Sequence, residues 1–304
     1  MKNKLIIRLS NNLGNQMFMY ATAYTFAKKL NRDLFIDNET AYKERNNIHK
    51  YDLDIFDISS KISPNKLKFL GPLGYIKRKL YKKLDIINKK KAFYIEPKNN
   101  NKQTNFNKNA MDISFKNVLH VEGHFETEKY FKDYINDIKK EFTFKKIKVF
   151  ENNKILHDIK NNESVAICIR QNRFSERKRP INEKDKENSD IFVDDQIRYI
   201  KKSIDIIKSK VTSPKFFLWS NDNKNLVKYF PTHQYTSVFT NEIDLDLFLM
   251  SQTKHFIVIP SSFNWWGAWL GRSRNSIVIR PSNNHFSNFR VNNNDFWPND
   301  WMIV

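Results

Sequence analysis

Residues 246–270 read DLFLMSQTKHFIVIPSSFNWWGAWL, and this stretch decides the fold class. It predicts a helix, then the buried strand 256–259, then a second helix at 263–270, which is the alternation of a parallel sheet covered by helices. The second helix opens with Ser261 and Ser262, just past the carboxyl end of the strand. Serine hydroxyls and free backbone N–H groups at a helix N-terminus can bind phosphate, although the two serines could equally do no more than cap the helix.

Strand and helix patterns alternate along most of the chain, in two series. The first series is a βαβ opening, with a strand at 5–9, a loop at 10–15, a helix at 16–30 and a strand at 34–36. The second series runs through a strand at 165–169, a helix at 195–208, a strand at 216–219, a helix at 245–252 and a strand at 277–279. We therefore expect an α/β protein with two doubly wound, Rossmann-like halves that face a cleft.

The two halves are expected to form separate domains. The N-terminal domain covers 1–150 and includes a basic, irregular insertion around 60–110, whereas the C-terminal domain covers 160–304. The segment 145–162 between them reads as a linker. At 304 residues the chain is long enough for each domain to bury a core of its own.

Composition limits the cellular setting of the protein. The single cysteine, Cys168, excludes an internal disulfide and suits a reducing compartment. We expect no N-terminal signal, because the apolar run at 5–7 is interrupted at Arg8, and no apolar run approaches the roughly 18 residues of a spanning helix. We expect a cytoplasmic protein, either soluble or peripheral on the inner face of the plasma membrane.

The formal net charge of +20 has several possible sources. It could attract nucleic acid, an anionic membrane or a phosphorylated ligand, or it could reflect a composition rich in lysine, asparagine and isoleucine. Nucleic acid is disfavoured, because no binding module is recognisable and the aromatic residues follow core-like patterns. The basic residues are densest between Lys61 and Lys108, where apolar residues are interleaved. These include Leu70, Leu73, Tyr75, Ile76, Leu80 and Tyr81, and the pattern favours a basic amphipathic helix on a membrane.

Two further positions are candidates for ligand contact. In the loop after the first strand, Gly14 permits close backbone approach and Asn15 offers an amide, but neither a G-x-G-x-x-G nor a Walker pattern is present. Arg170 follows the strand 165–169, where its planar fork matches phosphate oxygens, unless it forms only a surface salt bridge. Arg173, Arg177 and Arg179 follow and could add a diffuse positive field or be solvated.

We predict that the protein holds no metal ion. Residues 52–54 and 244–246 both spell D-x-D, a pattern that is common by chance and that places Asp246 in a helix instead of a loop. His120 and His124 have a helical spacing, but Gly123 and the strand pattern break the helix that would bring them together.

Four ordered segments resemble the bacterial α-1,2-fucosyltransferase family, glycosyltransferase family 11. Residues 13–21, LGNQMFMYA, resemble that family's LGNQMFQYA signature. Residues 121–131 are similar to its EGYFQSEKYF segment, and residues 216–222 resemble FFIFSDD. Residues 246–270 match DLxLMS…NSTFSWWGAWL.

This resemblance implies a GT-B-like fold with an N-terminal acceptor domain and a C-terminal donor domain. It further implies an inverting, metal-independent transfer of L-fucose from GDP-fucose, with no cofactor, to a galactoside in α-1,2 linkage during surface glycan or lipopolysaccharide synthesis. A galactoside-terminated oligosaccharide or lipid-linked glycan would be the acceptor.

The resemblance also implies roles for particular residues. Arg170 would hold the donor pyrophosphate, and Ser262, with Ser261 and Phe263 beside it, would bind phosphate. Asp246 would accept hydrogen bonds from guanine. Asn15 would lie near the reacting sugar, next to Gly14. Independently of the resemblance, Asp37 and Glu39 follow the second strand and are candidates for a general base.

One departure from the family pattern concerns the donor sugar. The family usually has H-x-R-R-G-D-Y where this chain has CIRQNRF at 168–174, so that the arginine survives while histidine becomes Cys168 and the acid becomes Arg173. This leaves a different GDP-6-deoxyhexose or a different acceptor open. A non-catalytic relative that binds sugar or nucleic acid is a further alternative.

Overall fold

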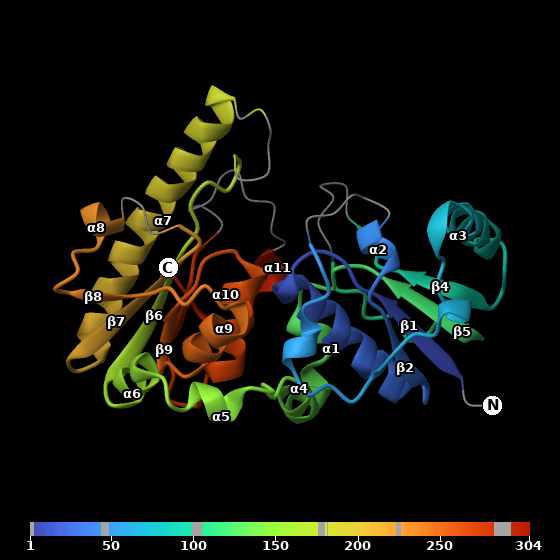
Figure 1. Ribbon diagram of the computed structural model, residues 1–304, viewed down its shortest axis with the longest axis horizontal. Helices are drawn as coiled ribbons and strands as arrows, with labels where there is room; N and C mark the ends of the chain where they lie inside the picture. Colours follow the sequence, from blue (N-terminus) through green and yellow to red (C-terminus); the bar gives the residue numbers. More distant parts are fainter. Residues whose placement is uncertain are drawn as a thin grey trace. The chain divides into compact units, whose positions relative to one another are not determined.

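The structure, a computed structural model, describes residues 3–43, 49–98, 105–175, 180, 182–222, 226–282 and 293–304. The chain divides into two compact units, each with a parallel sheet of its own (Figure 1). The first unit comprises Met1–Lys145 and Asn294–Pro298, and the second comprises Lys146–Asn293 and Asn299–Val304. No helix among the described residues is long and apolar enough to cross a membrane.

The first unit contains a five-stranded sheet in the order β3-β2-β1-β5-β4, with every pair parallel. Its strands are β1 (Lys4–Arg8), β2 (Asp33–Asp37), β3 (Lys61–Ile62), β4 (Lys91–Ile95) and β5 (Phe115–Glu122). Its helices are α1 (Leu13–Lys29), α2 (Thr40–Lys43), α3 (Gly71–Asp85) and α4 (Ile135–Glu141), and α11 (Asn293–Phe296) joins it near the C-terminus. The chain order reverses between β1 and β5, so a topological switch point lies at their carboxyl ends.

Helix α1 is more deeply buried than an amphipathic surface helix. Every residue from Gln16 to Ala27 is buried, because one side contacts β1 and β2 and another contacts the segments around Phe56 and Phe142. The hydroxyl of Tyr20 donates a 2.6 Å hydrogen bond to Glu141 Oε2 on that second side. The sequence pattern predicted only the face of α1 that meets the sheet.

The second unit contains a six-stranded parallel sheet in the order β11-β10-β9-β6-β7-β8. Its strands are β6 (Glu163–Ile169), β7 (Pro214–Ser220), β8 (Tyr235–Val238), β9 (His255–Ile257), β10 (Val278–Arg280) and β11 (Met302–Ile303). Numbered within the unit, this is the doubly wound order 3-2-1-4-5-6, and its switch point lies between β6 and β9.

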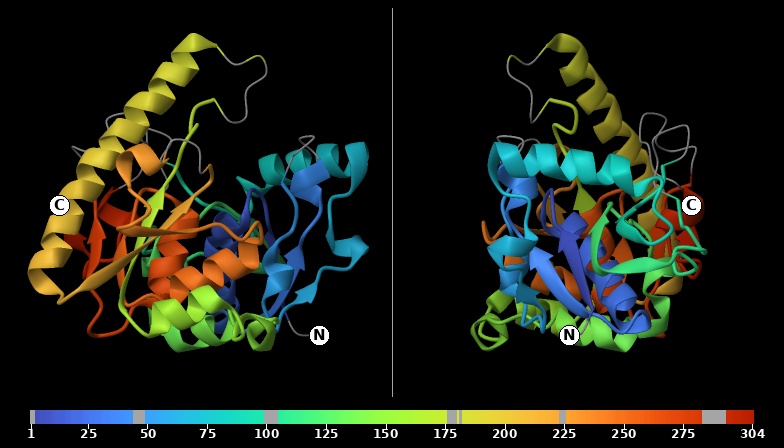
Figure 2. Two further views of the ribbon diagram at one scale, coloured as in Figure 1. Left: turned by 60° about the vertical axis from the view of Figure 1, so that its left-hand side comes forward. Right: turned by 90° about the vertical axis from the view of Figure 1, so that its right-hand side faces the viewer.

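Helices cover both faces of the second sheet. They are α5 (Ile147–Phe150), α6 (Lys154–Lys160), α7 (Glu183–Lys210), α8 (Leu226–Tyr229), α9 (Ile243–Ser251) and α10 (Ser262–Gly271). Figure 2 shows α7 on one face of this sheet and the pair α9 and α10 on the other. The pair packs closely, since a Cβ on Gly271 would lie 2.3 Å from the carbonyl oxygen of Ser251.

Several sequence-based assignments differ from the structure. The expected linker at 145–162 contains α5 and α6, which are too short to show a helical period. The region around 60–110, expected to be irregular apart from a basic amphipathic helix, contains that helix as α3 and, in addition, the unexpected strand β4. Helix α7 begins at Glu183, well before the expected 195, since the Asn182 side chain caps its first turn by accepting from the Asp185 N–H at 2.8 Å.

Candidate functional site

The switch point of the second unit brings two predicted segments to one edge of the sheet. Arg170 directly follows β6, whereas Ser261 and Ser262 follow the neighbouring strand β9. The two strands pair in parallel, with Ile167 opposite Ile257, so their carboxyl ends lie side by side. This is the edge at which ligands bind in open α/β sheets.

The backbone of Arg170 is clamped by one buried side chain. Gln196 of α7 accepts a hydrogen bond from the Arg170 N–H at 2.8 Å and donates one to the Arg170 carbonyl at 2.9 Å. Gln196 is fully buried, so its amide replaces the water that both backbone groups would otherwise bind. Gln196 was not identified from the sequence. The one available signal was that it is an uncharged amide on the side of the helix that faces the sheet.

The loop after Arg170 is tied to the end of β7. Gln171 N–H donates to Asn221 Oδ1 at 2.7 Å, and Asn221 Nδ2 returns a 3.0 Å bond to the Gln171 carbonyl. Asn172, whose φ is +55°, donates to the carboxylate of Asp222 at 3.2 Å. These contacts give the segment 220–222 a positioning role. Arg173 is partly buried, and Arg177 and Arg179 lie outside the described residues.

The N-terminus of α10 is built differently from a capped helix. Ser261 occupies the N-cap position with extended backbone angles, yet its side chain makes no capping hydrogen bond. Ser261, Ser262 and Phe263 are partly exposed, whereas the helix is buried from Asn264 to Trp269. The tryptophans of this helix are therefore core residues, while its first turn is open to a ligand.

Asp246 lies in the first turn of α9, at the same edge of the sheet. Its Oδ1 accepts a 3.0 Å hydrogen bond from the Thr240 hydroxyl, and burial raises its pKa. The other carboxylate of this D-x-D, Asp244, pairs with Lys146 at 3.0 Å instead. Within the described ranges, no three or more histidine, cysteine, aspartate or glutamate side chains gather as a metal site would require.

Cys168, which stands where the resembled family usually has histidine, lies in the interior of the second unit. It is 2% exposed, and its Sγ lies 3.7 Å from the sulfur of Met250 on α9. Burial raises the pKa of the thiol far above its usual range. The thiol therefore stays in its neutral, unreactive form.

In the first unit, the loop after β1 is shorter than expected. Helix α1 begins at Leu13 and not at Gln16, so Gly14 and Asn15 lie in its first turn. The strained turn residue is Asn11, with a φ of +62°. Gln16 fixes the turn: its Nε2 donates to the carbonyls of Asn11 at 2.8 Å and Lys50 at 2.7 Å.

This loop meets the end of β5 at the switch point of the first unit. Asn11 Nδ2 and His124 Nε2 lie 3.0 Å apart. Glu96, which follows β4, holds the turn that carries this histidine, because its Oε2 accepts the N–H groups of His124 and Phe125, both at 2.8 Å. A Cβ on Gly123 would lie 2.4 Å from Glu96 Cβ, so glycine allows the close approach. Sequence reasoning missed the roles of Glu96 and His124.

Glu96 should make the stability of the protein pH-dependent. Burial raises its pKa to about 7 although two N–H groups stabilise the carboxylate. A carboxyl group whose folded pKa is raised destabilises the folded state as pH rises from its usual pKa of 4.5 towards 7. At about 1.4 kcal/mol per pKa unit, the free energy of unfolding should fall by roughly 3 kcal/mol over this interval. Glu96→Gln should remove the fall, as measured by urea denaturation across this pH range.

The exposed residue Glu151 offers the matched control. Glu151→Gln should keep the pH profile of the wild type. Parallel profiles for the wild type and Glu96→Gln would show that Glu96 does not titrate in this interval.

The two candidate bases are engaged in structural contacts. Asp37 caps α2: its Oδ1 accepts the Thr40 N–H at 3.0 Å and its Oδ2 accepts the Thr40 hydroxyl at 2.6 Å. Glu39 forms ion pairs with Lys43 and Lys68, which lower its pKa. A carboxylate with a lowered pKa is a weak base, so Glu39 is poorly suited to accept a proton near neutral pH.

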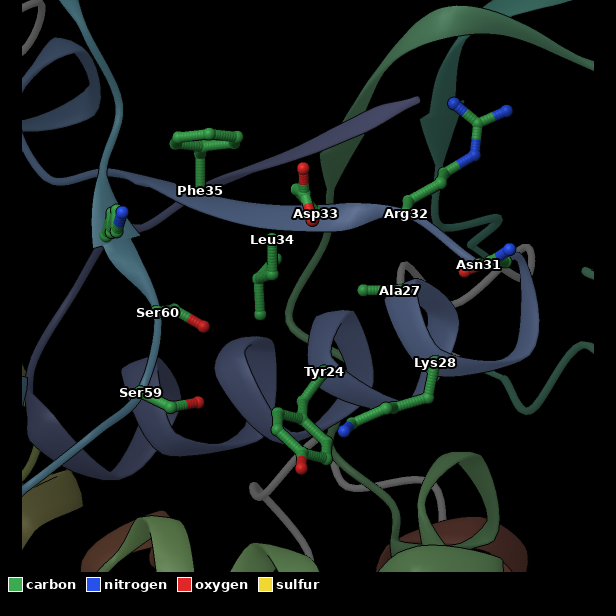
Figure 3. Close-up of a pocket in the computed structure, with 11 residues that line it drawn as sticks. Tyr24, Ala27, Lys28, Asn31, Arg32, Asp33, Leu34, Phe35, Ser59 and Ser60 are labelled. Carbon is green, nitrogen blue, oxygen red and sulfur yellow. The ribbon is translucent and has the colours of Figure 1, made fainter. Parts of the chain in front are cut away.

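The first unit contains a hollow of about 490 Å³, and Figure 3 shows the residues that line it. Tyr24 and Lys28 of α1, Arg32 and Asp33 at the start of β2, and Ser60 before β3 are among the residues that line it. These segments lie at the amino ends of the strands, the opposite edge from the loops after β1 and β5. None of the predicted site residues lines this hollow.

The whole chain resembles known glycosyltransferases. Alpha-1,2-colitosyltransferase from Escherichia coli is 27% identical over 308 residues, which cover 99% of this chain and 98% of that protein. The O-antigen biosynthesis glycosyltransferase WbnK from Escherichia coli is 25% identical over 288 residues, which cover 90% of this chain and 92% of that protein.

Solved structures show the same fold. The crystal structure of NodZ alpha-1,6-fucosyltransferase soaked with GDP-fucose has a TM-score of 0.52 and 13% identity, and the match covers 93% of this chain and 97% of that one. Fucosyltransferase NodZ from Bradyrhizobium, solved with selenomethionine, has the same score and identity over 93% and 96% of the two chains. Residues 1–304 match the model of the family described as glycosyl transferase family 11. The chain belongs to glycosyl transferase family 11.

Proposed function

We propose that this protein transfers L-fucose from GDP-fucose to a galactoside, in α-1,2 linkage, during the synthesis of a surface glycan or lipopolysaccharide. Membership of glycosyl transferase family 11 supports sugar transfer. The names of the two relatives support an α-1,2 linkage and an O-antigen acceptor. The observation that carries the proposal concerns the switch point of the second sheet. Arg170 and the N-terminus of α10, which carries Ser261 and Ser262, both lie there.

In the proposed mechanism, this edge of the second sheet binds the diphosphate of the donor. Arg170 offers a planar pair of N–H donors, and the first turn of α10 offers backbone N–H groups together with the hydroxyls of Ser261 and Ser262. As the bond between the anomeric carbon and phosphate oxygen breaks, negative charge grows on GDP. Fixed donors that face this charge stabilise the transition state more than the ground state.

The remaining roles concern the nucleoside and the sugar. Asp246 would accept N–H groups from the guanine edge, with Phe263 beside the phosphates. Gly14 and Asn15 of the first unit would lie near the sugar. The acceptor hydroxyl attacks the anomeric carbon from the face opposite GDP. Its oxygen forms the new bond as the bond to phosphate breaks, the configuration inverts, and the hydroxyl proton passes to solvent water. Because Asp37 and Glu39 are engaged elsewhere, the mechanism relies chiefly on stabilising the leaving group.

Colitose is the second candidate for the transferred sugar. It is favoured by the 27% identical relative named as an alpha-1,2-colitosyltransferase. The departure of segment 168–174 from the family pattern leaves a sugar other than fucose open, without naming one. The two candidates require the same diphosphate contacts and differ only in the sugar.

A donor panel tests the proposal directly. Purified protein would be incubated with a galactoside and, in turn, GDP-fucose, GDP-colitose, GDP-mannose or UDP-galactose, with and without EDTA. We expect transfer from one of the two GDP-deoxysugars, unchanged by EDTA, and a product whose new bond is α-1,2 by NMR. Transfer from UDP-galactose alone, or loss of activity with EDTA, would refute the proposal.

A further inference from the structure

The face of α3 that is open to solvent is apolar. Figure 2 (right) shows this helix, in teal, running across the upper part of the view above the strands of the first sheet. Large aliphatic side chains recur along it at helical spacing and remain exposed. They are Leu73 (82% exposed), Ile76 (60%), Leu80 (52%) and Leu84 (50%), and Ile87 (83%) continues the stripe just past the helix end.

The face of α3 that meets the sheet is charged. Arg78 donates from Nε and Nη2 to the two carboxylate oxygens of Glu122 on β5, both at 2.7 Å, and Lys82 adds a contact of 2.9 Å. Asp85 accepts the N–H groups of Ala92 and Phe93. The helix is therefore inverted with respect to an ordinary surface helix, which turns its apolar stripe towards the core.

The inverted orientation means that folding of the unit does not use the apolar stripe. A hollow of about 640 Å³ lies beside α3, lined by Phe69, Tyr81, Phe93 and His120 among others. Among the described residues, the contacts of α3 with the rest of the unit are mainly the ion pairs and hydrogen bonds described above, together with the edge-to-face contact of Tyr81 with Phe69. A contiguous apolar stripe on a surface helix is typical of an interaction site.

The charge around the stripe indicates which partner covers it. Exposed lysines flank the apolar residues, and the only acidic residue of α3, Asp85, is buried. These lysines are Lys77, Lys79, Lys83, Lys89 and Lys90. Two copies of this chain that met through this face would bring lysines together without carboxylates to pair with them. An anionic lipid surface offers both phosphate groups and an apolar layer.

We propose that α3 docks this protein on the surface of an anionic membrane, with its apolar stripe in the acyl boundary and its lysines at the headgroups. The helix lies in the plane of the interface, as expected for a 15-residue helix flanked by lysine. The proposal does not depend on which sugar is transferred. It places the enzyme where lipid-linked glycan acceptors are found.

Vesicle flotation with the full chain tests this proposal. Wild-type protein should float with vesicles of phosphatidylcholine and phosphatidylglycerol, and it should stay in the dense fraction with phosphatidylcholine alone. The variant Leu73→Ser/Ile76→Ser/Leu80→Ser should bind at least about tenfold more weakly, because its stripe no longer enters the apolar layer. Lys77→Gln/Lys83→Gln/Lys89→Gln should also lose binding, and salt should weaken the wild type.

Two controls separate docking from other effects. Val149→Ser removes an apolar side chain of similar exposure (69%) in the second unit and should float like the wild type. GDP should raise the melting temperature of the serine variant as much as that of the wild type, so a failure of docking is distinguishable from a failure of donor binding. Equal flotation of the wild type and the serine variant would overturn the proposal. So would a wild-type dimer that the serine substitutions convert to a monomer.

Discussion

Replacing Arg170 by alanine is expected to lower kcat/KM for the GDP-sugar by about 10²–10⁴-fold. The two charge-assisted hydrogen bonds proposed between Arg170 and the diphosphate would contribute about 1.5–3 kcal/mol each, and every 1.4 kcal/mol is about a factor of ten. Arg170→Lys should fall between alanine and the wild type, because it keeps the charge and loses the planar fork. Steady-state kinetics with saturating acceptor measure both effects.

The fold should survive these substitutions of Arg170. Gln196 holds the main chain of Arg170 through backbone groups that alanine retains. The melting temperature without ligand should therefore stay close to that of the wild type. With GDP at about 100 times its Kd, the wild type should gain about 2.7 kcal/mol, and the alanine variant should gain much less at the same concentration.

An exposed arginine on α7 provides the matched control for Arg170. The side chain of Arg198 is 71% exposed. Its ion pair with Asp195 is the only one that α7 forms among the described residues. Arg198→Ala should leave kcat/KM and GDP stabilisation unchanged. Unchanged turnover in Arg170→Ala would refute the role proposed for this arginine.

Replacing Arg78 by methionine should lower the free energy of unfolding by about 3–5 kcal/mol. Burial of Glu122 by itself would raise its pKa, but hydrogen bonds and charge from Arg78 and Lys82 outweigh burial and hold the pKa at about 2. Without the guanidinium, a buried carboxylate keeps only the lysine, and a broken buried pair costs energy of this size. Urea denaturation at neutral pH measures the loss.

The pH dependence distinguishes this ion pair from a packing effect. A carboxylate with a lowered folded pKa stabilises the protein above its usual pKa of 4.5, and this contribution is lost as pH falls towards 2. The difference between the wild type and Arg78→Met should therefore shrink in this acid interval. Glu122→Gln added to Arg78→Met should recover part of the loss. Lys83→Met, on the exposed side of the same helix, should change stability by less than about 0.5 kcal/mol.

Elements with a strong local pattern could be predicted from the sequence. The strand at 165–169 is a continuous apolar run because both faces of a parallel sheet are covered. The strand in the structure ends at the same residue and begins two residues earlier, at Glu163. β4 escaped prediction because its five residues, KAFYI, follow a run of lysines at the edge of the sheet. The start of α7 could not be predicted from apolar periodicity, because its first residues are mostly charged and show no apolar face. The side-chain cap of Asn182 fixes where the helix begins.

The supporting residues of the site could not be predicted from local pattern. Arg170 and Ser261 were identifiable because each follows an apolar strand, where a parallel sheet places its ligands. Gln196 and Glu96 act through backbone groups that are 26 and 28 or more residues away in the chain. Their roles depend on how α7 packs on β6 and how β4 lies beside β5. Neither arrangement produces a recognisable pattern in the sequence around Gln196 or Glu96. The same is true of α3, whose sequence is amphipathic but does not reveal which face is inward.

The C-terminal segment constrains any attempt to exchange parts between relatives. Residues 294–298 belong to the first unit, where the carboxylate of Asp295 accepts from the Phe106 N–H at 2.8 Å and from Lys129 Nζ at 2.6 Å. Residues 299–304 return to the second unit and add β11 beside β10. A chimaera that joins the N-terminal half of one transferase to the C-terminal half of another at a single junction near 145 would therefore mismatch residues 294–298. An exchange of the whole second unit needs three junctions, with residues 294–298 kept from the parent that supplies the first unit.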